Sequence, residues 1–428
     1  MPRAPQTLAQ KIIAKAAGRD AVAPGEIVIC RVDLAMMHDS GGPRRLKPIL
    51  ERLGVKVWDP DRIVVVADHY VPAIDADSAS ILGLTRRWVA EQGIRAFYDM
   101  QGICHVVLPE RGHLRPGLFV VGGDSHSPTG GALGCFMFGV GATDMAGVAA
   151  TGETWLRVPE TIRLTWTGAL GLGTCAKDIM LHLCATLGME GGDNQVIEYD
   201  GAAVRALPMT ERMTLCNMAA ELGAMTGMVA PDETTAAYVR DAGADPGDWR
   251  RWRGDDGAPL HLHLTFDAAT LAPQVAAPHS PANAAPVGEV ESARIDQAYI
   301  GACTGAKLVD LHMAARVLTG RKVAPGLRLL LAPASQRITQ QAAGDGTLAA
   351  VTEAGAILRP SGCGACAGLG AGLLDEGEVC ISTTARNFKG RMGAKTAKVY
   401  LGSPYTVAAA AVAGRIVDPR PLLAEAAR

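Results

Sequence analysis

The stretch Pro-Ser-Gly-Cys-Gly-Ala-Cys-Ala-Gly, residues 360–368, places two thiols, Cys363 and Cys366, in a Cys-x-x-Cys pair among glycines. A third thiol, Cys303, lies sixty residues upstream in the segment Tyr-Ile-Gly-Ala-Cys-Thr-Gly, residues 299–305. A lone cysteine combined with a distant pair suits a four-iron cluster that is held at three corners and leaves its fourth iron free. An iron with an open position is a Lewis acid, so the three cysteines predict chemistry as well as structure.

The Cys-x-x-Cys pair taken alone is compatible with half a zinc site, a redox pair or a chance occurrence. Zinc requires two further ligands at matching spacing, and the sequence has no second Cys-x-x-Cys. A redox pair usually begins a helix after a strand, whereas the glycines around this pair indicate a flexible loop. Such glycines would let backbone N–H groups approach the sulfides of a cluster. The spacing alone leaves these interpretations open.

The composition describes a globular protein with room for two or three domains. The chain has 428 residues, of which 48% are hydrophobic, and a formal net charge of -2. The balanced charge and the 4% aromatic content argue against a nucleic-acid-binding surface. No apolar run reaches the length of a membrane span. The ten cysteines lack the density of a disulfide scaffold, which favours a reducing, cytoplasmic location.

The first twenty residues carry four basic residues before the first acid, a pattern also seen in transit peptides. Leu8, Ile12 and Ile13 recur at helical spacing, so we favour an amphipathic first helix with these side chains facing inward.

Strand-like and helical runs alternate along the chain, which predicts an α/β fold with mostly parallel sheets flanked by helices. We expect domains at residues 1–162, 163–284 and 285–428, the second ending in a proline- and alanine-rich interdomain linker at residues 271–287. The expected strands are residues 26–34, 62–67, 118–122, 161–166, 195–199, 295–303, 327–331 and 379–382, and the expected helices include 177–187, 210–222 and 407–413.

Two strand ends carry an acid and a histidine, in Asp68-His69 and in Asp124-x-His126. Sites in α/β folds lie at the carboxyl ends of parallel strands. A carboxylate beside an imidazole fixes its tautomer and raises its basicity, so both are candidate acid–base pairs. Either pair alone is more simply a histidine held by local hydrogen bonds. Two pairs together with three thiols favour a site.

Further candidates are weaker when each is taken separately. His105 and Glu198 form a possible third pair, and His38, which precedes an aspartate after a strand, is a lesser candidate. Arg386 and Arg391 are five residues apart and suit carboxylate binding, because guanidinium binds carboxylate in a bidentate manner. A solvated basic loop is the simpler interpretation of those arginines alone. No complete glycine-rich nucleotide motif is present.

These segments together resemble the aconitase superfamily, most closely its 3-isopropylmalate dehydratase large subunits. The resemblance rests on residues 123–131, 211–218, 299–305, 360–368 and 386–393, which occur in the same order within a region from residue 7 to about residue 415. It implies a three-domain α/β large subunit with an iron–sulfur cluster at the domain interface. The implied reaction is dehydration of a hydroxy di- or tricarboxylic acid to an enoate, followed by rehydration.

The resemblance also implies roles for individual residues. Cys303, Cys363 and Cys366 would bind a [4Fe-4S] cluster, whose free iron would hold the substrate hydroxyl and carboxylate. His69 with Asp68 would protonate the leaving hydroxyl. The other residues implied are the dyads His126 with Asp124 and His105 with Glu198, and the substrate-binding residues Ser125, Arg386 and Arg391.

One expected part is missing from this sequence. The family's proton-abstracting serine lies in a Ser-Ser-Arg-type loop of a swivelling fourth domain, and we find no such loop here. The resemblance therefore implies a separate small subunit that carries the base, so this chain alone is expected to be inactive. The chain also has Gly305, Ala365 and Ala385 where the family usually has Asn, Pro and Asn. Loss of two amides near the cluster leaves the exact substrate open.

Several alternatives remain at this stage. Within the same class they are an aconitate or homoaconitate hydratase subunit and a maleate- or methylmalate-type hydratase subunit. An iron-regulated RNA-binding protein also occurs in the superfamily, but the near-neutral charge and the chain length disfavour it. A zinc-binding structural subunit is a third class, which metal analysis would distinguish.

Overall fold

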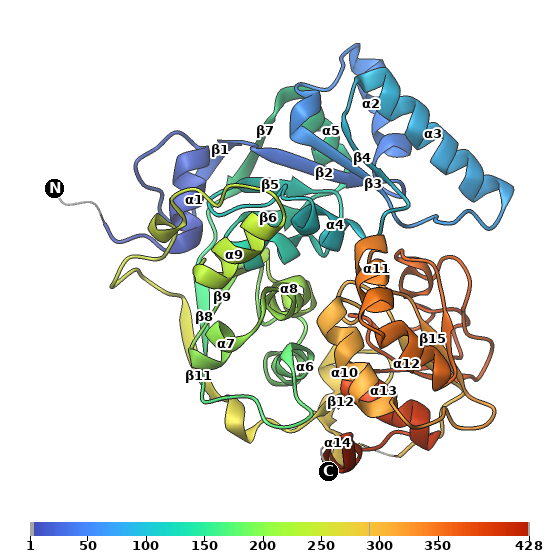
Figure 1. Cartoon of the computed structure of the whole chain (residues 1–428). Helices are drawn as coiled ribbons and strands as arrows, with labels where there is room; N and C mark the ends of the chain where they lie inside the picture. Colours follow the sequence, from blue (N-terminus) through green and yellow to red (C-terminus); the bar gives the residue numbers. More distant parts are fainter. Residues whose placement is uncertain (1–3, 291, 427–428) are drawn as a thin grey trace.

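The structure is a computed structural model, and it describes residues 4–290 and 292–426. Within these residues, four β-sheets are surrounded by helices (Figure 1). The five-stranded sheet lies in the upper half of that view, and the four- and seven-stranded sheets lie below it. None of the described helices combines the length and apolar character needed to span a bilayer.

The five-stranded sheet is entirely parallel, in the order β4-β3-β2-β5-β6. Its strands are β2 (Leu34–His38), β3 (Ile63–Ala67), β4 (Ala96–Asp99), β5 (Phe119–Gly122) and β6 (Phe136–Gly139). Its helices are α2 (Pro43–Leu53), α3 (Ala76–Gln92), α4 (Cys104–Glu110) and α5 (Ala142–Thr151). The chain builds outward from β2 to β4 and then returns to the other side of β2. The carboxyl ends of β2 and β5 therefore form a topological switch point, where α/β sheets bind ligands.

The N-terminal region partly matches its prediction. Helix α1 (Leu8–Ala16) buries Leu8, Ile12 and Ile13, which confirms the amphipathic helix. The single strand expected over residues 26–34 is instead interrupted, because β1 (Ile27–Arg31) ends before β2 begins. Strand β1 pairs in antiparallel fashion with β7 (Glu153–Arg157) and forms a separate two-stranded ribbon.

The four-stranded sheet is also parallel, in the order β10-β9-β8-β11. Its strands are β8 (Thr161–Thr167), β9 (Val196–Asp200), β10 (Thr226–Val229) and β11 (Leu262–Asp267). The helices of this region are α6 (Ala176–Leu187), α7 (Ala202–Ala206), α8 (Met209–Asn217) and α9 (Glu233–Asp241). The helix expected over residues 210–222 ends at Asn217 and continues as the 3-10 turn η3 (Met218–Leu222).

The seven-stranded sheet has the order β13-β12-β18-β17-β14-β15-β16. Its parallel strands are β14 (Gln297–Ile300), β15 (Arg328–Leu331), β16 (Ala356–Leu358), β17 (Val379–Ser382) and β18 (Lys398–Gly402). The helices are α10 (Leu308–Leu318), α11 (Gln336–Gly344), α12 (Thr347–Glu353), α13 (Pro404–Ala413) and α14 (Arg420–Ala426). The chain again reverses direction around its first parallel strand, so β14 and β17 create a second switch point.

Residues 271–287 do not form the extended linker that their composition predicts. They contain β12 (Gln274–Ala276) and β13 (Ala284–Pro286), which pair with each other and extend the seven-stranded sheet through β18. The carboxylate of Asp178 on α6 accepts the backbone N–H of Gln274 at 2.8 Å, which fixes this edge to the neighbouring region. Tertiary pairing has therefore overridden the proline-rich composition, since these prolines lie at strand ends and turns.

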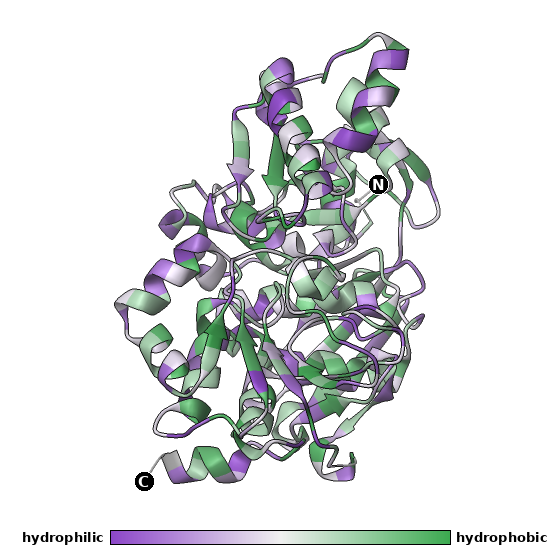
Figure 2. Ribbon diagram, turned by 90° about the vertical axis from the view of Figure 1, so that its right-hand side faces the viewer, coloured by the Kyte–Doolittle hydropathy of each residue, from purple (hydrophilic) through white to green (hydrophobic). Residues whose placement is uncertain are grey.

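Three backbone hydrogen bonds join the five-stranded and seven-stranded regions. Ile103 donates to the Ala334 carbonyl, Gln336 donates to the Gln101 carbonyl, and the Cys363 N–H donates to the Asp68 carbonyl, at 2.9, 2.9 and 2.7 Å. Hydrophobic residues concentrate in the sheets and on the helix sides facing them (Figure 2). The contact between these two regions brings the two switch points together.

Candidate active site

A cavity of about 420 Å³ lies at the junction of the two switch points. Its lining comes from the ends of β2, β3 and β5, from the start of α4, from the segment after β14, and from the loops that follow β16 and β17. The lining residues are His38, Ser40, His69, Tyr70, Ile103, His105, Gly123, Asp124, Ser125, His126, Ala302, Cys303, Cys363, Cys366, Ala367, Leu369, Ala385, Arg386 and Arg391. The fold therefore gathers into one cavity segments that lie more than 350 residues apart in sequence.

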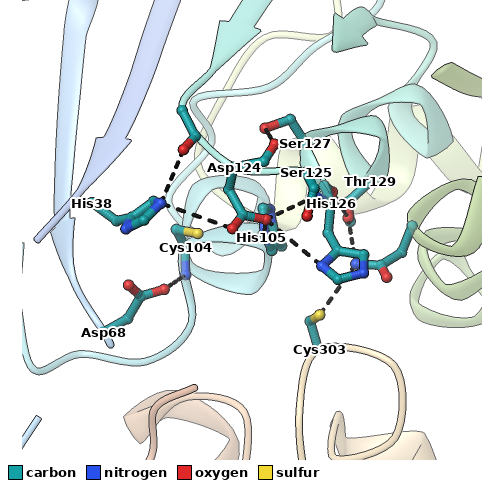
Figure 3. A network of polar contacts seen from close by, with 12 residues as sticks. His38, Asp68, Cys104, His105, Asp124, Ser125, His126, Ser127, Thr129 and Cys303 are labelled. Atoms are coloured by element: carbon teal, nitrogen blue, oxygen red, sulfur yellow. Dashed lines mark hydrogen bonds and ion pairs between the residues drawn. The ribbon is translucent and has the colours of Figure 1, made fainter. Parts of the chain in front are cut away.

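All three predicted metal-binding cysteines line this cavity. Cys303 follows β14, Cys363 directly precedes the 3-10 turn η8 (Gly364–Ala367), and Cys366 lies within that turn. The Asn217 side-chain amide donates a hydrogen bond to the Cys303 sulfur at 3.1 Å, part of the network in Figure 3. Burial raises the pKa of Cys303 to about 12, whereas the hydrogen bond from Cys363 lowers the pKa of Cys366 to about 6. Metal binding would supply the energy needed to keep all three thiols deprotonated.

The separation of the cysteines argues against a single zinc ion. Among the described residues, the sets of three or more ligand atoms within 4.8 Å of one another are two histidine–aspartate groups, and neither contains a cysteine. Two sulfur ligands of one zinc ion lie within about 4.6 Å of each other, because each Zn–S bond is about 2.3 Å. At least one pair of the three thiols therefore lies farther apart than one zinc ion allows, and three thiols lining one cavity fit a multi-iron cluster, whose usual ligands are thiolates.

His69 and Asp68 form the predicted acid–base pair at the end of β3. The Asp68 carboxylate lies 2.7 Å from His69 Nδ1 and also accepts the backbone N–H of Cys104 at 2.7 Å. Burial opposes charge on both groups, but their mutual attraction is stronger. The pKa of His69 is therefore raised to about 9 and that of Asp68 lowered to about 2. At neutral pH this imidazole is therefore protonated.

The other two dyads are paired differently from the prediction. Asp124 Oδ1 lies 2.7 Å from His105 Nε2, whereas it lies 3.7 Å from His126 Nδ1 (Figure 3). His126 Nε2 is 2.9 Å from Glu221 Oε1 instead. Asp124 does accept the backbone N–H of His126 at 2.7 Å. Its carboxyl pKa is held well below its usual range by His105, against the opposing effect of burial.

The predicted pairing of His105 with Glu198 is wrong. Glu198 lies in the middle of β9, opposite Arg163 of β8, and the two side chains form an ion pair at 2.9 Å. This cross-strand pair lines a different cavity, so Glu198 does not reach the thiols. The sequence prediction missed Glu221, which lies in η3 just beyond the matched run 211–218. No sequence signal singles it out, because its partners His126 and Arg386 are 95 and 165 residues away.

The two arginines occupy different positions in the cavity. Arg386 Nε lies 2.9 and 3.0 Å from the Glu221 carboxylate oxygens, and its Nη1 donates to Ser125 Oγ at 3.0 Å. Arg391 Nε is buried and has no hydrogen-bond partner among the described residues. An unpaired buried guanidinium nitrogen beside a cavity marks a position for an anionic group, because an unsatisfied buried donor is costly.

His38, only a lesser candidate from the sequence, belongs to the same cavity. Its ring stacks on that of His69 with the centroids 4.1 Å apart, and its Nε2 lies 3.0 Å from the Gly123 carbonyl oxygen. The backbone N–H groups of Ser40 and Gly41 donate to its Nδ1, so the proton resides on Nε2. Burial lowers the pKa of His38, so this ring is a neutral neighbour of the charged His69.

The departures at residues 305 and 385 have distinct structural consequences. A Cβ atom at Gly305 would lie 2.2 Å from Thr383 Cβ, so this position has no room for a side chain. The Thr383 hydroxyl donates to the Gly301 carbonyl and accepts the Gly301 N–H, both at 2.9 Å. Ala385 lines the cavity with a single methyl group and leaves space beside the thiols.

Comparison with known proteins supports the resemblance. The sequence profile of the Aconitase family (aconitate hydratase) matches residues 10–414, so the chain belongs to this family. It is 49% identical to 3-isopropylmalate dehydratase large subunit 1 of Methanopyrus kandleri, over 98% of this chain and 100% of that one. It is 43% identical to the 3-isopropylmalate dehydratase large subunit of Aquifex aeolicus, over 96% of both chains.

A relative with a different name shows nearly the same similarity. The probable methanogen homoaconitase large subunit of Methanothermobacter thermautotrophicus is 44% identical, over 96% of this chain and 97% of that one. Among solved structures, aconitase X of Thermococcus kodakaraensis matches with a TM-score of 0.51 and 14% identity, over 84% of both chains. This structural match supports the aconitase-like α/β fold alone.

Proposed function

We propose that this chain is the iron–sulfur large subunit of a hydro-lyase that isomerises 3-isopropylmalate through an enoate intermediate. One observation carries the proposal: three thiols share a 420 Å³ cavity with the His69–Asp68 pair. Cys303, Cys363 and Cys366 would hold a [4Fe-4S] cluster, which supplies a Lewis acid that weakens the bond to the leaving hydroxyl.

His69 supplies the proton that hydroxide needs in order to leave. Its raised pKa keeps it protonated at neutral pH, and Asp68 engages its Nδ1, so Nε2 is the atom that donates. The charge that remains on Asp68 after transfer stabilises the pair for the reverse step. A positioned acid of this kind typically contributes a factor of about 10² to 10⁴ in rate.

The cavity offers cationic partners for the substrate carboxylates. Arg391 Nε has no hydrogen-bond partner within the described part of the chain, and Arg386 Nη1 donates to the Ser125 hydroxyl at 3.0 Å. Glu221 holds the other edge of Arg386 in place. Guanidinium groups aimed at two carboxylates orient the substrate and stabilise the charge that develops when the neighbouring C–H bond breaks.

A small subunit is the proposed partner of this chain. The similar proteins are named large subunits, and the sequence of this chain contains no Ser-Ser-Arg motif. A hollow of about 790 Å³ shares Asp124, Ser125 and Arg386 with the site and extends to the β1–β7 ribbon. Ile27, Ile29 and Trp155 are 70, 66 and 66% exposed on that ribbon, and exposed apolar groups beside a site suit a protein partner. The ten cysteines are free thiols, which supports a cytoplasmic location.

The test is anaerobic reconstitution of the purified chain, alone and with its small subunit. We expect about four iron and four sulfide per chain, and hydration or dehydration only by the assembled pair. Cys366→Ser should abolish both the cluster absorbance and turnover. Zinc without iron or sulfide in an anaerobic preparation would contradict the proposal.

The alternative substrate is homocitrate, as the 44% identity to a probable homoaconitase indicates. The same assembled pair should be given 3-isopropylmalate and homocitrate in parallel, with enoate formation followed by ultraviolet absorbance. The larger kcat/KM assigns the substrate. Turnover of homocitrate alone would replace 3-isopropylmalate in the proposal.

A further inference from the structure

A fully buried lysine lies behind the thiol-lined cavity. Lys177 is 1% exposed and occupies the first turn of α6. Its ammonium donates to the Thr384 and Thr383 carbonyl oxygens at 2.6 and 3.1 Å, and to Thr304 Oγ1 at 3.5 Å. Thr304 follows Cys303 directly, and the two carbonyls precede the cavity residues Ala385 and Arg386. Lys177 thus connects two of the loops that form the site.

This ammonium has no carboxylate partner. Within the described ranges 4–290 and 292–426, no acid lies within 4.0 Å of its nitrogen. Lys307 provides the contrast. It is equally buried and donates to the Cys303 carbonyl at 3.0 Å, but its charge is neutralised by Asp310, whose carboxylate lies at 2.7 Å. An isolated buried charge costs several kcal/mol, so proteins pair such charges or place them against a bound ion of opposite sign.

The cysteines are the source of the negative charge that acts most strongly on the Lys177 ammonium. Burial lowers the pKa of Lys177 to about 8, and Cys303 and Cys366 are the main groups that oppose this change. A cluster bound to three thiolates is the group that would place negative charge at this position. The potential of such a cluster depends on nearby charges and hydrogen bonds.

We propose that Lys177 is the buried counter-charge of the iron–sulfur cluster and holds the Cys303 and Thr383–Thr384 loops around it. This inference rests on the proposed function, because it requires that the thiols carry a cluster. The positive charge stabilises the more negative, reduced form, and it retains the cluster against loss. Lys177 is therefore a positioning residue that acts through the cluster rather than on the substrate.

The test compares Lys177→Gln, which keeps a donor but removes the charge, with Lys177→Arg, which keeps the charge. After anaerobic reconstitution, the cluster's reduction potential is measured by redox titration followed by electron paramagnetic resonance. We expect Lys177→Gln to disfavour reduction at least tenfold, which is a shift of 59 mV to lower potential for one electron. Lys177→Arg should shift it by less than half of that. Lys177→Gln should also lose iron faster to a chelator.

The control is the double variant Lys307→Met/Asp310→Asn, which removes an equally buried lysine together with its negative partner. It leaves the net charge unchanged, so the potential should move by less than half the shift of Lys177→Gln. The cluster-free form of Lys177→Gln should unfold at a temperature no lower than the cluster-free wild type, because the unpaired charge is gone.

Three outcomes overturn the inference: an unchanged potential in Lys177→Gln, an equal shift in the control, or a cluster-free Lys177→Gln chain that fails to fold. Failure of the wild-type chain to bind any cluster is a separate result. It would contradict the proposed function itself.

Discussion

At the scale of single residues, the site depends on which acid holds which histidine. Three imidazoles, those of His69, His105 and His126, each contact a carboxylate at 2.7 to 2.9 Å. Only the contact between His69 and Asp68 joins residues that are adjacent in sequence. Because a carboxylate within hydrogen-bond distance fixes the tautomer of an imidazole, each pairing determines which ring nitrogen carries a proton.

The pH dependence of the reaction should follow His69. Its folded-state pKa, about 9, lies above the ordinary 6.5, so the protonated form persists through neutral pH and is lost as pH rises through about 9. The rate of dehydration by the assembled enzyme should therefore fall along the alkaline limb of the pH–rate profile, as the pH rises through about 9. Asp68→Asn should move the limb to lower pH and reduce kcat by about 10² to 10⁴. A pH–rate profile that Asp68→Asn leaves in place would contradict the assignment.

Two glutamates provide a matched test of the corrected pairing. Glu221→Gln weakens the contacts with both His126 and Arg386, so kcat/KM should fall at least a hundredfold. Glu198→Gln alters only the pair with Arg163 in another cavity, and should stay within about threefold of wild type. Steady-state kinetics of the assembled variants measures both. A greater loss in Glu198→Gln than in Glu221→Gln would restore the original prediction.

At the scale of helices and strands, the sequence predicted most elements but not their partners. Periodicity and β-branched runs identified β3, β5, β8, β9, β15 and β17 to within a residue or two at either end. Composition misplaced residues 271–287, because pairing of β12 with β18 is a contact over 120 residues that no local pattern encodes. The same limit explains Glu198: side-chain partners such as His126 and Glu221 are 95 residues apart.

Gly305 shows how two elements restrict one position. The turn after β14 packs on the loop after β17, and Thr383 fills the space that a side chain at 305 would need. Gly305→Asn should destabilise the chain by about 1–3 kcal/mol through overpacking. Gly305→Asn/Thr383→Gly should recover most of that loss. Chemical denaturation of the cluster-free forms measures both, and equal stability of Gly305→Asn and wild type would contradict the packing argument.

At the scale of the whole molecule, the five-stranded and seven-stranded regions meet near their switch points, and the cavity is lined by residues of both. The class of fold and the three thiols were predictable, because their segments match a family in order. The exposed surface that borders the cavity was not predictable from the sequence. The exposure of its side chains depends on the β1–β7 ribbon lying apart from the larger sheets.

Association with the small subunit should depend on that ribbon. Trp155 pairs across the strands with Ile29, and both side chains are 66% exposed. Trp155→Ala should weaken binding about thirtyfold, in line with about 2 kcal/mol for an aromatic contact at an interface centre. The thermal stability of the isolated chain should change little. Calorimetric titration measures the affinity, and unchanged binding would place the partner elsewhere.

The hydrogen bond from the Cys363 amide to the Asp68 carbonyl ties the proposed proton donor, His69, to the loop of residues 360–368 that is proposed to bind the cluster. That carbonyl belongs to the peptide bond that joins Asp68 to His69. Oxidants that strip iron and let residues 360–368 shift would pull the acid out of alignment by the same movement. Loss of the proposed cluster would thus remove both the Lewis acid and the aligned proton donor, and repair of the cluster would restore both together.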